Sequence, residues 1–383
     1  MRKILYISGT RADYGLMRQT LLSIKRHPKL KLEIVATGMH LMPEFEKTID
    51  EIKKDNFKIR KVEAVYERDN KESMTNFIGE FTLKLTKVIK RVKPDIILVE
   101  GDRAEMLVGA IIGAYLTIPV AHIHGGDLTT TVDEFARHAI TKLSHIHFPA
   151  TKKSAQRIIK MGEDPWRVFV VGAPGLDSIL NEKLFSKKEI LKKYNLDDSQ
   201  PILLVLQHPV TTEVEDAPRQ MRETMEVVRE LGHQAIVIYP NADPGGRRMI
   251  KVIEKYRNCP FLKICKSLPH TDYLSLMKVI NVMVGNSSSG IIEAPFFHLA
   301  VVNIGQRQEG RERAENVINV NYNKEEIKKA IEKALYNDDF KEKVKNCKSP
   351  YEEGKTGLRI VNILSKIKID KKLLQKQITY RKI

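Results

Sequence analysis

Short apolar runs rich in β-branched residues alternate with longer segments of helical periodicity along most of the chain. In the first half, six such runs span residues 3–8, 32–37, 95–100, 119–123, 146–149 and 168–172. Continuous apolar runs of this length are typical of strands in a parallel sheet that helices cover on both faces. The first half is therefore predicted to be an α/β domain.

The same alternation starts again after residue 200. Five further runs, at 201–207, 234–240, 261–265, 280–285 and 299–304, are predicted strands. We expect two Rossmann-like domains, residues 1–178 and 179–355, which face each other across a cleft. Residues 356–383 combine helical apolar spacing with a basic tail. They are expected to pack back across the domains, with the last ten residues disordered.

The central stretch 120–138 carries a concentrated group of polar side chains. Its apolar run stops at His124, and a glycine turn then leads to Asp127. Asp133 and Arg137 follow at a spacing that places them on one face of a helix start. Capping of that helix by Thr131 or Asp133 is an alternative for either residue alone, but it does not explain the whole group.

Two other strand ends in the first half carry similar chemistry. The first strand leads into the segment SGTRADYG, whose backbone N–H groups and Arg11 could hold a phosphate at a helix start. Its spacing differs from the Walker loop and from the dinucleotide fingerprint. The strand at 95–100 ends in Gly-Asp-Arg, where Asp102 either caps the following helix or presents its carboxylate to the cleft.

The second half repeats this arrangement. His208 directly follows a predicted buried strand and precedes a proline, which is a poor position for core packing and favours a functional role. The strand at 280–285 leads to three serines and a glycine at a helix start, an arrangement that suits an anion. Glu293 lies about one turn further on, where it could accept from ribose hydroxyls. Arg307 and Arg311 follow the last strand and could clamp a diphosphate, the alternative being a solvated loop.

Composition narrows the classes of partner. The 383 residues are 42% hydrophobic and 30% charged, with a net charge of +17 that is largely scattered lysine. Solvated helix faces explain this charge better than a nucleic-acid surface, because no nucleic-acid module accompanies it. No apolar run approaches the roughly 20 residues that span a bilayer, and the first apolar run is too short for a signal peptide. We therefore expect a cytoplasmic protein that binds neither nucleic acid nor membrane.

Seven motifs together resemble the hydrolysing UDP-N-acetylglucosamine 2-epimerases, in order from about residue 3 to residue 355. They are GTRADYG at 9–15, GDR at 101–103, HIHGGD at 122–127, VDEFARHAITKLSHIHF at 132–148, QHPVTTE at 207–213, GNSSSGIIEAP at 285–295 and GQRQEGRERAENV at 305–317. The resemblance implies a glycosyltransferase-B-like architecture. It also implies conversion of UDP-N-acetylglucosamine and water to UDP and N-acetylmannosamine, as in sialic acid biosynthesis, by a homodimer or homotetramer.

The resemblance also implies a mechanism: anti elimination of UDP to a glycal, followed by addition of water. The catalytic residues expected are Asp102, His124, Asp133 and His208. The substrate-binding residues expected are Arg11, Asp13, Arg103, Asp127, Arg137, Ser287, Ser288, Ser289, Gly290, Glu293, Arg307 and Arg311. We expect no metal and no cofactor, because no carboxylate cluster has a magnesium-site pattern. Many family members carry glutamate at the position of His124, which leaves Asp127 and Asp133 as the available carboxylates.

Three other functions remain open from the sequence. A UDP-2,4-diacetamido-2,4,6-trideoxyhexose, on the route to legionaminic acid, would undergo the same reaction. A UDP-sugar-dependent glycosyltransferase would share the architecture but would release little free sugar without an acceptor. A nucleotide-sugar sensor would keep the serine segment but would not need the group at 102–138. Turnover without an acceptor separates a hydrolysing epimerase, a glycosyltransferase and a sensor from one another.

Overall fold

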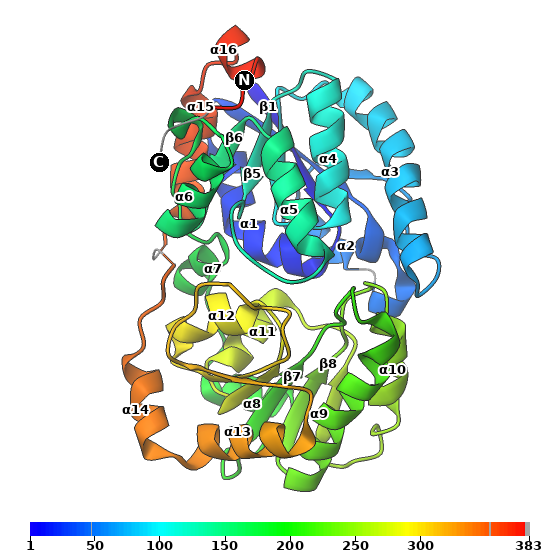
Figure 1. The fold of residues 1–383 in the computed structure, drawn as a ribbon, viewed down its shortest axis with the longest axis vertical. Coiled ribbons are helices and arrows are strands. Elements are labelled where there is room, and N and C mark those ends of the chain that lie inside the picture. The colour runs from blue at the N-terminus through cyan, green and yellow to red at the C-terminus, as the bar shows by residue number, and fades with distance from the viewer. Residues whose placement is uncertain (47, 352–353, 380–383) are drawn as a thin grey trace.

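The fold consists of two six-stranded sheets in which all paired strands run parallel. The computed structural model describes residues 1–46, 48–351 and 354–379. The sheets form two lobes, one above the other in Figure 1, with strand orders β3-β2-β1-β4-β5-β6 and β12-β11-β10-β7-β8-β9. The prediction of two Rossmann-like α/β domains is confirmed.

The first sheet is covered by helices on both faces. Its strands are β1 (Arg2–Ser8), β2 (Leu30–Ala36), β3 (Ile59–Lys61), β4 (Ile96–Glu100), β5 (Val120–Ile123) and β6 (Ile146–Phe148). The helices are α1 (Arg11–Arg26), α2 (Ile49–Lys54), α3 (Lys71–Val92), α4 (Ala104–Tyr115), α5 (Val132–Leu143) and α6 (Lys152–Lys160). Side chains alternate along β4, so that Ile96 and Leu98 pack towards α1, and Ile97 and Val99 towards α3 and α4.

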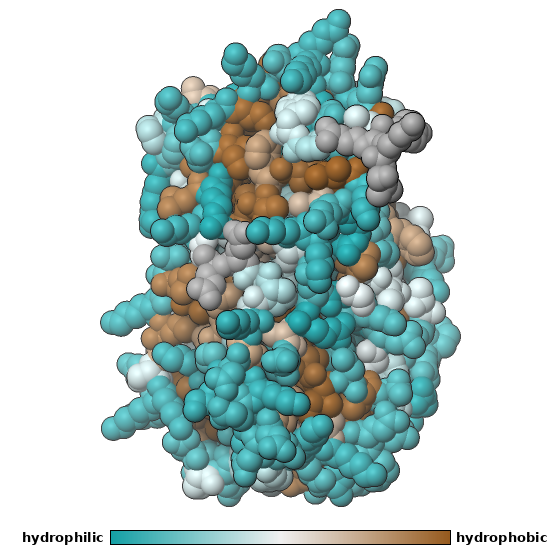
Figure 2. Space-filling model, turned by 60° about the vertical axis from the view of Figure 1, so that its left-hand side comes forward, coloured by the Kyte–Doolittle hydropathy of each residue, from teal (hydrophilic) through white to brown (hydrophobic). Residues whose placement is uncertain are grey.

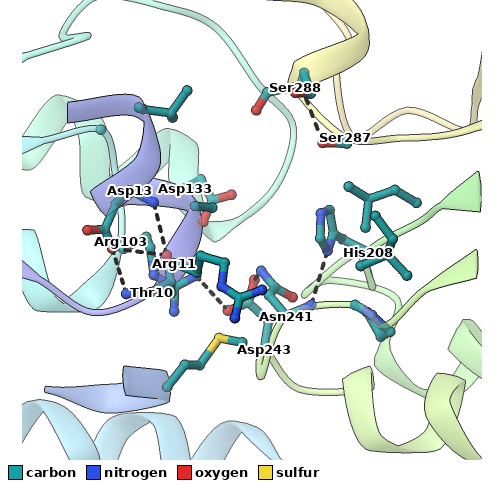
Figure 3. A pocket seen from close by; sticks show the side chains of 18 of the residues that line it. Thr10, Arg11, Asp13, Arg103, Asp133, His208, Asn241, Asp243, Ser287 and Ser288 are labelled. Atoms are coloured by element: carbon teal, nitrogen blue, oxygen red, sulfur yellow. Dashed lines mark hydrogen bonds and ion pairs between the residues drawn. The ribbon is translucent and has the colours of Figure 1, made fainter. Parts of the chain in front are cut away.

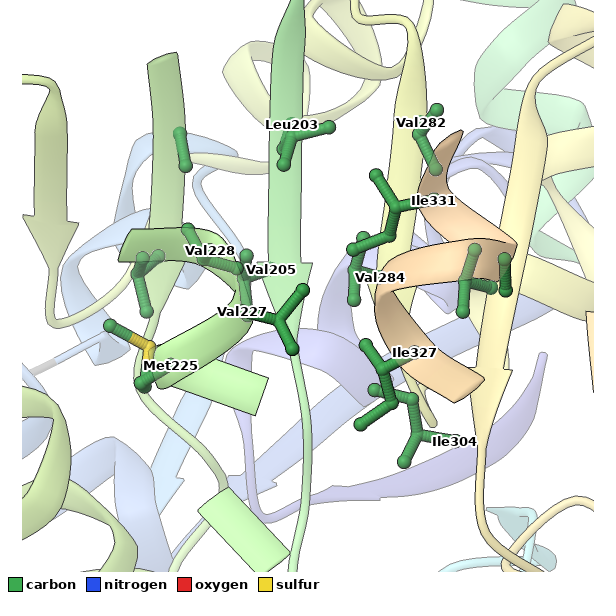
Figure 4. Packing of buried hydrophobic residues seen from close by; sticks show 14 of the residues in the cluster. Leu203, Val205, Met225, Val227, Val228, Val282, Val284, Ile304, Ile327 and Ile331 are labelled. Atoms are coloured by element: carbon green, nitrogen blue, oxygen red, sulfur yellow. The ribbon is translucent and has the colours of Figure 1, made fainter. Parts of the chain in front are cut away.

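The second domain repeats this layering. Its strands are β7 (Ile202–Leu206), β8 (Gln234–Ile238), β9 (Leu262–Cys265), β10 (Val282–Gly285), β11 (Ala300–Ile304) and β12 (Val317–Val320). The helices are α8 (Lys187–Lys193), α9 (Ala217–Leu231), α10 (Gly246–Glu254), α11 (His270–Met277), α12 (Ser289–Ile292), α13 (Lys324–Tyr336) and α14 (Asp338–Asn346). Figure 4 shows apolar side chains of α9 and α13, such as Val227 and Ile331, packed on the strands β7 and β10.

Two chain segments connect the lobes. The helix α7 (Gly175–Asn181) precedes the second domain, and its Leu176 packs against Ile291 of α12. After α14 the chain returns along the left side of Figure 1 to α15 (Thr356–Lys366) and α16 (Lys371–Leu374). The residues Ile360 and Leu364 of α15 pack into the core of the first domain, beside α1. The carboxyl-terminal segment therefore completes the domain that the amino terminus begins.

The segment after α16 is more ordered than the sequence predicts. The ammonium group of Lys376 donates to the carbonyl of Ser144 at 2.7 Å, and the N–H of Thr379 donates to the carbonyl of Gly162 at 3.0 Å. The expected disorder of the last ten residues is therefore wrong for residues 374–379. Residues 380–383 lie outside the described part of the chain.

The strand prediction needs correction at three places. Residues 168–172 form only an isolated bridge, between His147 and Val168, because the chain turns away at Gly172 and reaches Pro174, which has no N–H donor. The strands β3 and β12 were not predicted. Both lie at sheet edges and are half-buried or exposed, so their sequences IRK and VINV lack a long apolar run.

The outer surface is predominantly polar. Hydrophilic side chains dominate the face in Figure 2, and the apolar ones lie in separated patches between them. Within the described residues, no helix combines the length and apolar character that crossing a membrane requires.

A pair of substitutions in α15 tests the packing of the carboxyl-terminal helix. Leu364 is fully buried, whereas Leu358 on the same helix is 61% exposed. Leu364→Ala is expected to destabilise the first domain by about 2–5 kcal/mol, because it leaves a cavity in the core. Leu358→Ala should change stability by less than about 0.5 kcal/mol. Urea unfolding followed by fluorescence of the single tryptophan, Trp166 in the first domain, measures both. Equal effects of the two substitutions would contradict this packing.

Candidate active site

A cleft lies where the carboxyl ends of both sheets face each other. Figure 3 shows Asp13, Arg103 and Asp133 entering it from the first domain, and His208 and Ser287 from the second. Of the sixteen predicted site residues, fourteen line this cleft: Arg11, Asp13, Asp102, Arg103, His124, Asp133, Arg137, His208, Ser287, Ser288, Ser289, Glu293, Arg307 and Arg311. The two that do not are Asp127, which lies behind His124, and Gly290.

Arg137 connects three parts of the first domain beneath the cleft. It is fully buried on α5, and its guanidinium forms an ion pair with Asp102 at the end of β4. The same guanidinium donates to the carbonyl of Asp127 at 3.2 Å and to the hydroxyl of Thr129 at 3.1 Å. The helix α4 begins without a side-chain cap, so Asp102 does not have the capping role. Its carboxylate is instead held at the cleft by Arg137.

His124 is held in an unusual backbone conformation next to a carboxylate. It follows β5 directly and has a φ of 59°, a left-handed conformation that is uncommon for a residue with a side chain. Its Nδ1 lies 3.4 Å from a carboxylate oxygen of Asp127. Burial disfavours ionisation of Asp127, but the contacts with His124 and Arg311 outweigh burial and lower its pKa to about 2. Burial also lowers the pKa of His124, and Asp127 reverses this, so that the net shift is upward.

Asp133 reaches across the cleft to the second domain. The cap of α5 is Thr131, whose hydroxyl accepts from the N–H of Asp133 at 3.2 Å. The Asp133 carboxylate is therefore free of the capping role and lies 3.4 Å from the guanidinium of Arg307. Burial raises the pKa of Asp133, and the positive charge of Arg307 offsets only part of this rise. The cleft thus holds a carboxylate that is more basic than an exposed aspartate.

The surroundings of His208 define the tautomer of its ring. The backbone N–H of Asn241 donates to Nδ1 of His208 at 3.1 Å, so the neutral ring carries its proton on Nε2. Burial, with Arg307 and Arg103 nearby, places the pKa of His208 well below its usual value. Asn286 fixes the backbone, accepting from the N–H of His208 at 2.7 Å and donating to its carbonyl at 2.9 Å. His208 therefore presents a neutral N–H donor.

The loop after β1 is shaped by Asp13. Its carboxylate accepts from the N–H of Gly9 at 3.0 Å and from the N–H of Thr10 at 2.7 Å, in a capping box at the start of α1. These contacts give Asp13 a role in positioning the loop, and direct contact with a substrate stays a prediction. Arg11 lines the cleft from this loop, with its Nε 3.0 Å from Glu51.

The serine segment lies at the start of a very short helix. The helix α12 has four residues, and a 3₁₀ helix (Ala294–Phe297) follows at Pro295, as the proline predicts. A side chain at Gly290 would place its Cβ 2.8 Å from Val301, so this glycine allows α12 to pack on β11. Glu293 is 3% exposed, and burial raises its pKa. Gly290 thus has a packing role, whereas the serines and Glu293 face the cleft.

Several residues that line the cleft were not singled out from the sequence. They are Glu100, Asn241, Asp243, His270 and Tyr273. Glu100 is the last residue of an apolar strand, and a charged residue in that position was an available signal. Asn241 and Asp243 follow β8 in the same manner. His270 and Tyr273 lie on α11, and only the folded structure brings this helix to the cleft. Within the described chain, no three metal-ligating side chains come together to hold a metal ion.

The two facing parallel sheets, with polar side chains at their carboxyl ends, define a glycosyltransferase-B-like protein with a nucleotide-sugar type of cleft. The family model "UDP-N-acetylglucosamine 2-epimerase" matches residues 22–365. The chain belongs to this family, as its motifs predict, and it is a UDP-sugar 2-epimerase.

Curated relatives support this assignment, and a solved structure shares the fold. The chain is 41% identical to UDP-N,N'-diacetylbacillosamine 2-epimerase (hydrolyzing) of Legionella pneumophila, over 98% of this chain and 99% of the relative. It is 34% identical to UDP-N-acetylglucosamine 2-epimerase of Neisseria meningitidis serogroup B, over 87% and 88% of the two chains. The fold is similar to the crystal structure of UDP-GlcNAc 2-epimerase from Neisseria meningitidis bound to UDP-GlcNAc, with a TM-score of 0.80 at 20% identity, covering 95% and 100% of the chains.

The predicted role of Arg307 as an anion anchor is open to direct measurement. Arg307→Ala is expected to weaken UDP binding by about 10-fold to 100-fold, because a hydrogen bond to a charged group contributes about 1.5–3 kcal/mol. Isothermal titration with UDP measures the change. Arg219→Ala is the control, since Arg219 lies on α9 and pairs with Asp216 outside the cleft. Unchanged UDP affinity in Arg307→Ala would exclude the anchor.

Proposed function

We propose that this protein is a hydrolysing 2-epimerase, which converts a UDP-2-acetamido sugar and water to UDP and the free 2-epimerised sugar. One observation carries the proposal: carboxylates and an imidazole on the first domain face a cationic and hydroxyl-bearing wall on the second. The first set suits proton transfer at a sugar ring, and the second suits a departing diphosphate.

The second domain would hold UDP. Arg307 and the Nε2–H of His208 supply a fixed charge and a neutral donor towards the diphosphate, and the hydroxyls of Ser287 and Ser288 lie on the same wall. Glu293 would accept from the ribose hydroxyls. A diphosphate that leaves carries two to three negative charges, and preorganised donors of this kind stabilise such charge as it develops.

The first domain would carry out the proton chemistry. Elimination removes the C2 proton on the face opposite to the departing UDP, which requires a positioned base. Asp102 and Asp133 both form ion pairs with arginines, which hold their carboxyl groups at the cleft wall. They and His124 are the groups that we assign to proton transfer and to stabilisation of the cationic anomeric centre.

The sugar is the finer part of the proposal. Of the two UDP sugars that the sequence leaves open, we propose UDP-N,N'-diacetylbacillosamine, a 2,4-diacetamido-2,4,6-trideoxyhexose, as the better substrate, ahead of UDP-N-acetylglucosamine. The 41% identical relative carries that activity in its name. Leu16, Met39 and Phe45 also form an apolar part of the cleft wall on the first domain. Such a wall suits a methyl group at C6 better than a hydroxyl.

Initial rates with both UDP sugars test the substrate. We expect kcat/KM to favour the diacetamido sugar by about 10-fold to 100-fold, the range by which a hydrophobic pocket discriminates against an added hydroxyl. The product, identified by proton NMR, should be the free 2-epimerised sugar, without any acceptor. A preference for UDP-N-acetylglucosamine would reverse the choice of sugar. Release of sugar only on addition of an acceptor would favour a glycosyltransferase.

Replacement of Asp102 tests the catalytic assignment. Asp102→Asn should lower turnover by about 10² or more, because the amide cannot transfer a proton and disrupts the pair with Arg137. Asp95→Asn is the matched control, since Asp95 lies at the opposite end of β4, where it accepts from the N–H of Lys3 at 2.7 Å. Steady-state kinetics should show near-normal turnover for this control. Near-normal turnover in Asp102→Asn would remove Asp102 from the mechanism.

A further inference from the structure

Four carboxyl groups of the first domain line the cleft, and that of Glu100 has no role in the proposed reaction so far. Glu100 is the last residue of β4 and pairs in register with Ile123 of β5, which places it beside His124. By strand alternation its side chain leaves the sheet on the same face as Leu98, towards α1. It is 8% exposed and lines the cleft. Glu100 therefore lies beneath the sugar side of the cleft.

Glu100 differs from the neighbouring carboxylates in its partners. Asp102, Asp127 and Asp133 each form an ion pair with an arginine. Across the described parts of the chain, no hydrogen bond or ion pair reaches the carboxyl oxygens of Glu100. A buried carboxyl group without a partner is costly as an anion and much less so as a neutral acid.

The charges around Glu100 come from every element that packs near it. The pKa of Glu100 is raised to about 7. Burial is the largest cause, and the negative charge of Asp13 on α1 adds to it. His124 after β5, Arg311 after β11 and Arg137 on α5 act in the opposite direction. Tyr6 on β1 faces the same space, and the charge of Glu100 raises its pKa. Near neutral pH, a substantial fraction of Glu100 is consequently protonated.

The proposed reaction needs such a group. Inversion at C2 requires that a proton leave one face of the ring and that another arrive on the opposite face, so two different groups take part. The ion-paired Asp102 and Asp133 are suited to accept the first proton. We propose that Glu100 is the general acid that delivers the second proton, to C2 of the glycal intermediate. This inference rests on the proposed hydrolysing reaction.

The step balances without a further reactant. The π electrons of the C1=C2 bond take the proton of the Glu100 carboxyl, which forms the new C2–H bond and leaves a cation at C1. A water oxygen then bonds to C1 and loses one proton. That proton restores the Glu100 carboxyl, and the base that took the original C2 proton returns it to solvent. The net products are UDP, the free 2-epimerised sugar and one released proton.

The variant Glu100→Gln separates proton transfer from packing. Glutamine keeps the shape and the neutral state but cannot give up a proton, so a purely structural role would survive the change. We expect UDP release to continue while formation of the free sugar falls by about 10². Proton NMR should then show the glycal, by its vinyl hydrogen, accumulating with UDP. Glu33→Gln is the control, because Glu33 is also buried, on β2, but pairs with Lys58 and Arg60 outside the cleft.

The pH profile supplies a second, independent readout. A general acid is active below its pKa, so kcat/KM of the unchanged protein should fall as the pH rises through about 7. This alkaline limb should be absent in Glu100→Gln and present in Glu33→Gln. An alkaline limb that persists in Glu100→Gln, with normal sugar formation, would overturn the proposal and make His124 the acid. Failure of the unchanged protein to release free sugar would instead refute the proposed function.

Discussion

The cleft of the first domain depends on one buried guanidinium, that of Arg137. It joins the end of β4, through Asp102, to the turn after β5, through the carbonyl of Asp127, and it does so from the middle of α5. Removal of one partner from a buried ion pair typically costs about 3–5 kcal/mol, because the other charge is left without compensation. The positions of the carboxylates that we propose as catalytic therefore depend on this contact as much as on the strands that precede them.

Two arginines of the second domain contact residues 127–133 from the other side of the cleft. Arg311 lies 3.4 Å from Asp127, and Arg307 lies 3.4 Å from Asp133. The hydroxyl of Thr130 donates to the carbonyl of Gln306 at 2.7 Å between these two pairs. Residues 127–133 are thus one segment at which the first and second domains touch. A diphosphate held by Arg307 would lie close to Asp133, which is the geometry that a concerted loss of UDP and of the C2 proton needs.

Much of the fold was predictable because buried parallel strands have continuous apolar sequences. The runs that end just before His124, His208 and Asn286 also predicted the position of the cleft. Polar residues at the carboxyl ends of neighbouring parallel strands lie together at one edge of their sheet. The edge strands β3 and β12 were missed because edge strands need no apolar run. The contact of Arg137 with Asp102 joins residues 35 positions apart, which no local pattern shows.

The least predictable features are those that depend on contacts, or missing contacts, between residues far apart in the sequence. Glu100 has the sequence signature of a strand end, but its unpaired, buried state is visible only when the partners of its neighbours are known. The tautomer of His208 follows from a backbone N–H of Asn241, on a different strand end. Asp13 was predicted to bind substrate; its hydrogen bonds to the loop after β1 show a positioning role, and the substrate contact stays a prediction.

In the proposed mechanism, UDP leaves by elimination and water then adds to the glycal. Reaction in deuterated water enriched in ¹⁸O, followed by NMR and mass spectrometry of the free sugar, tests it most directly. The proposed mechanism predicts one deuterium at C2 of the free sugar and no ¹⁸O in UDP. Product without deuterium at C2, or ¹⁸O in the diphosphate, would contradict elimination and show that the cleft performs a different reaction.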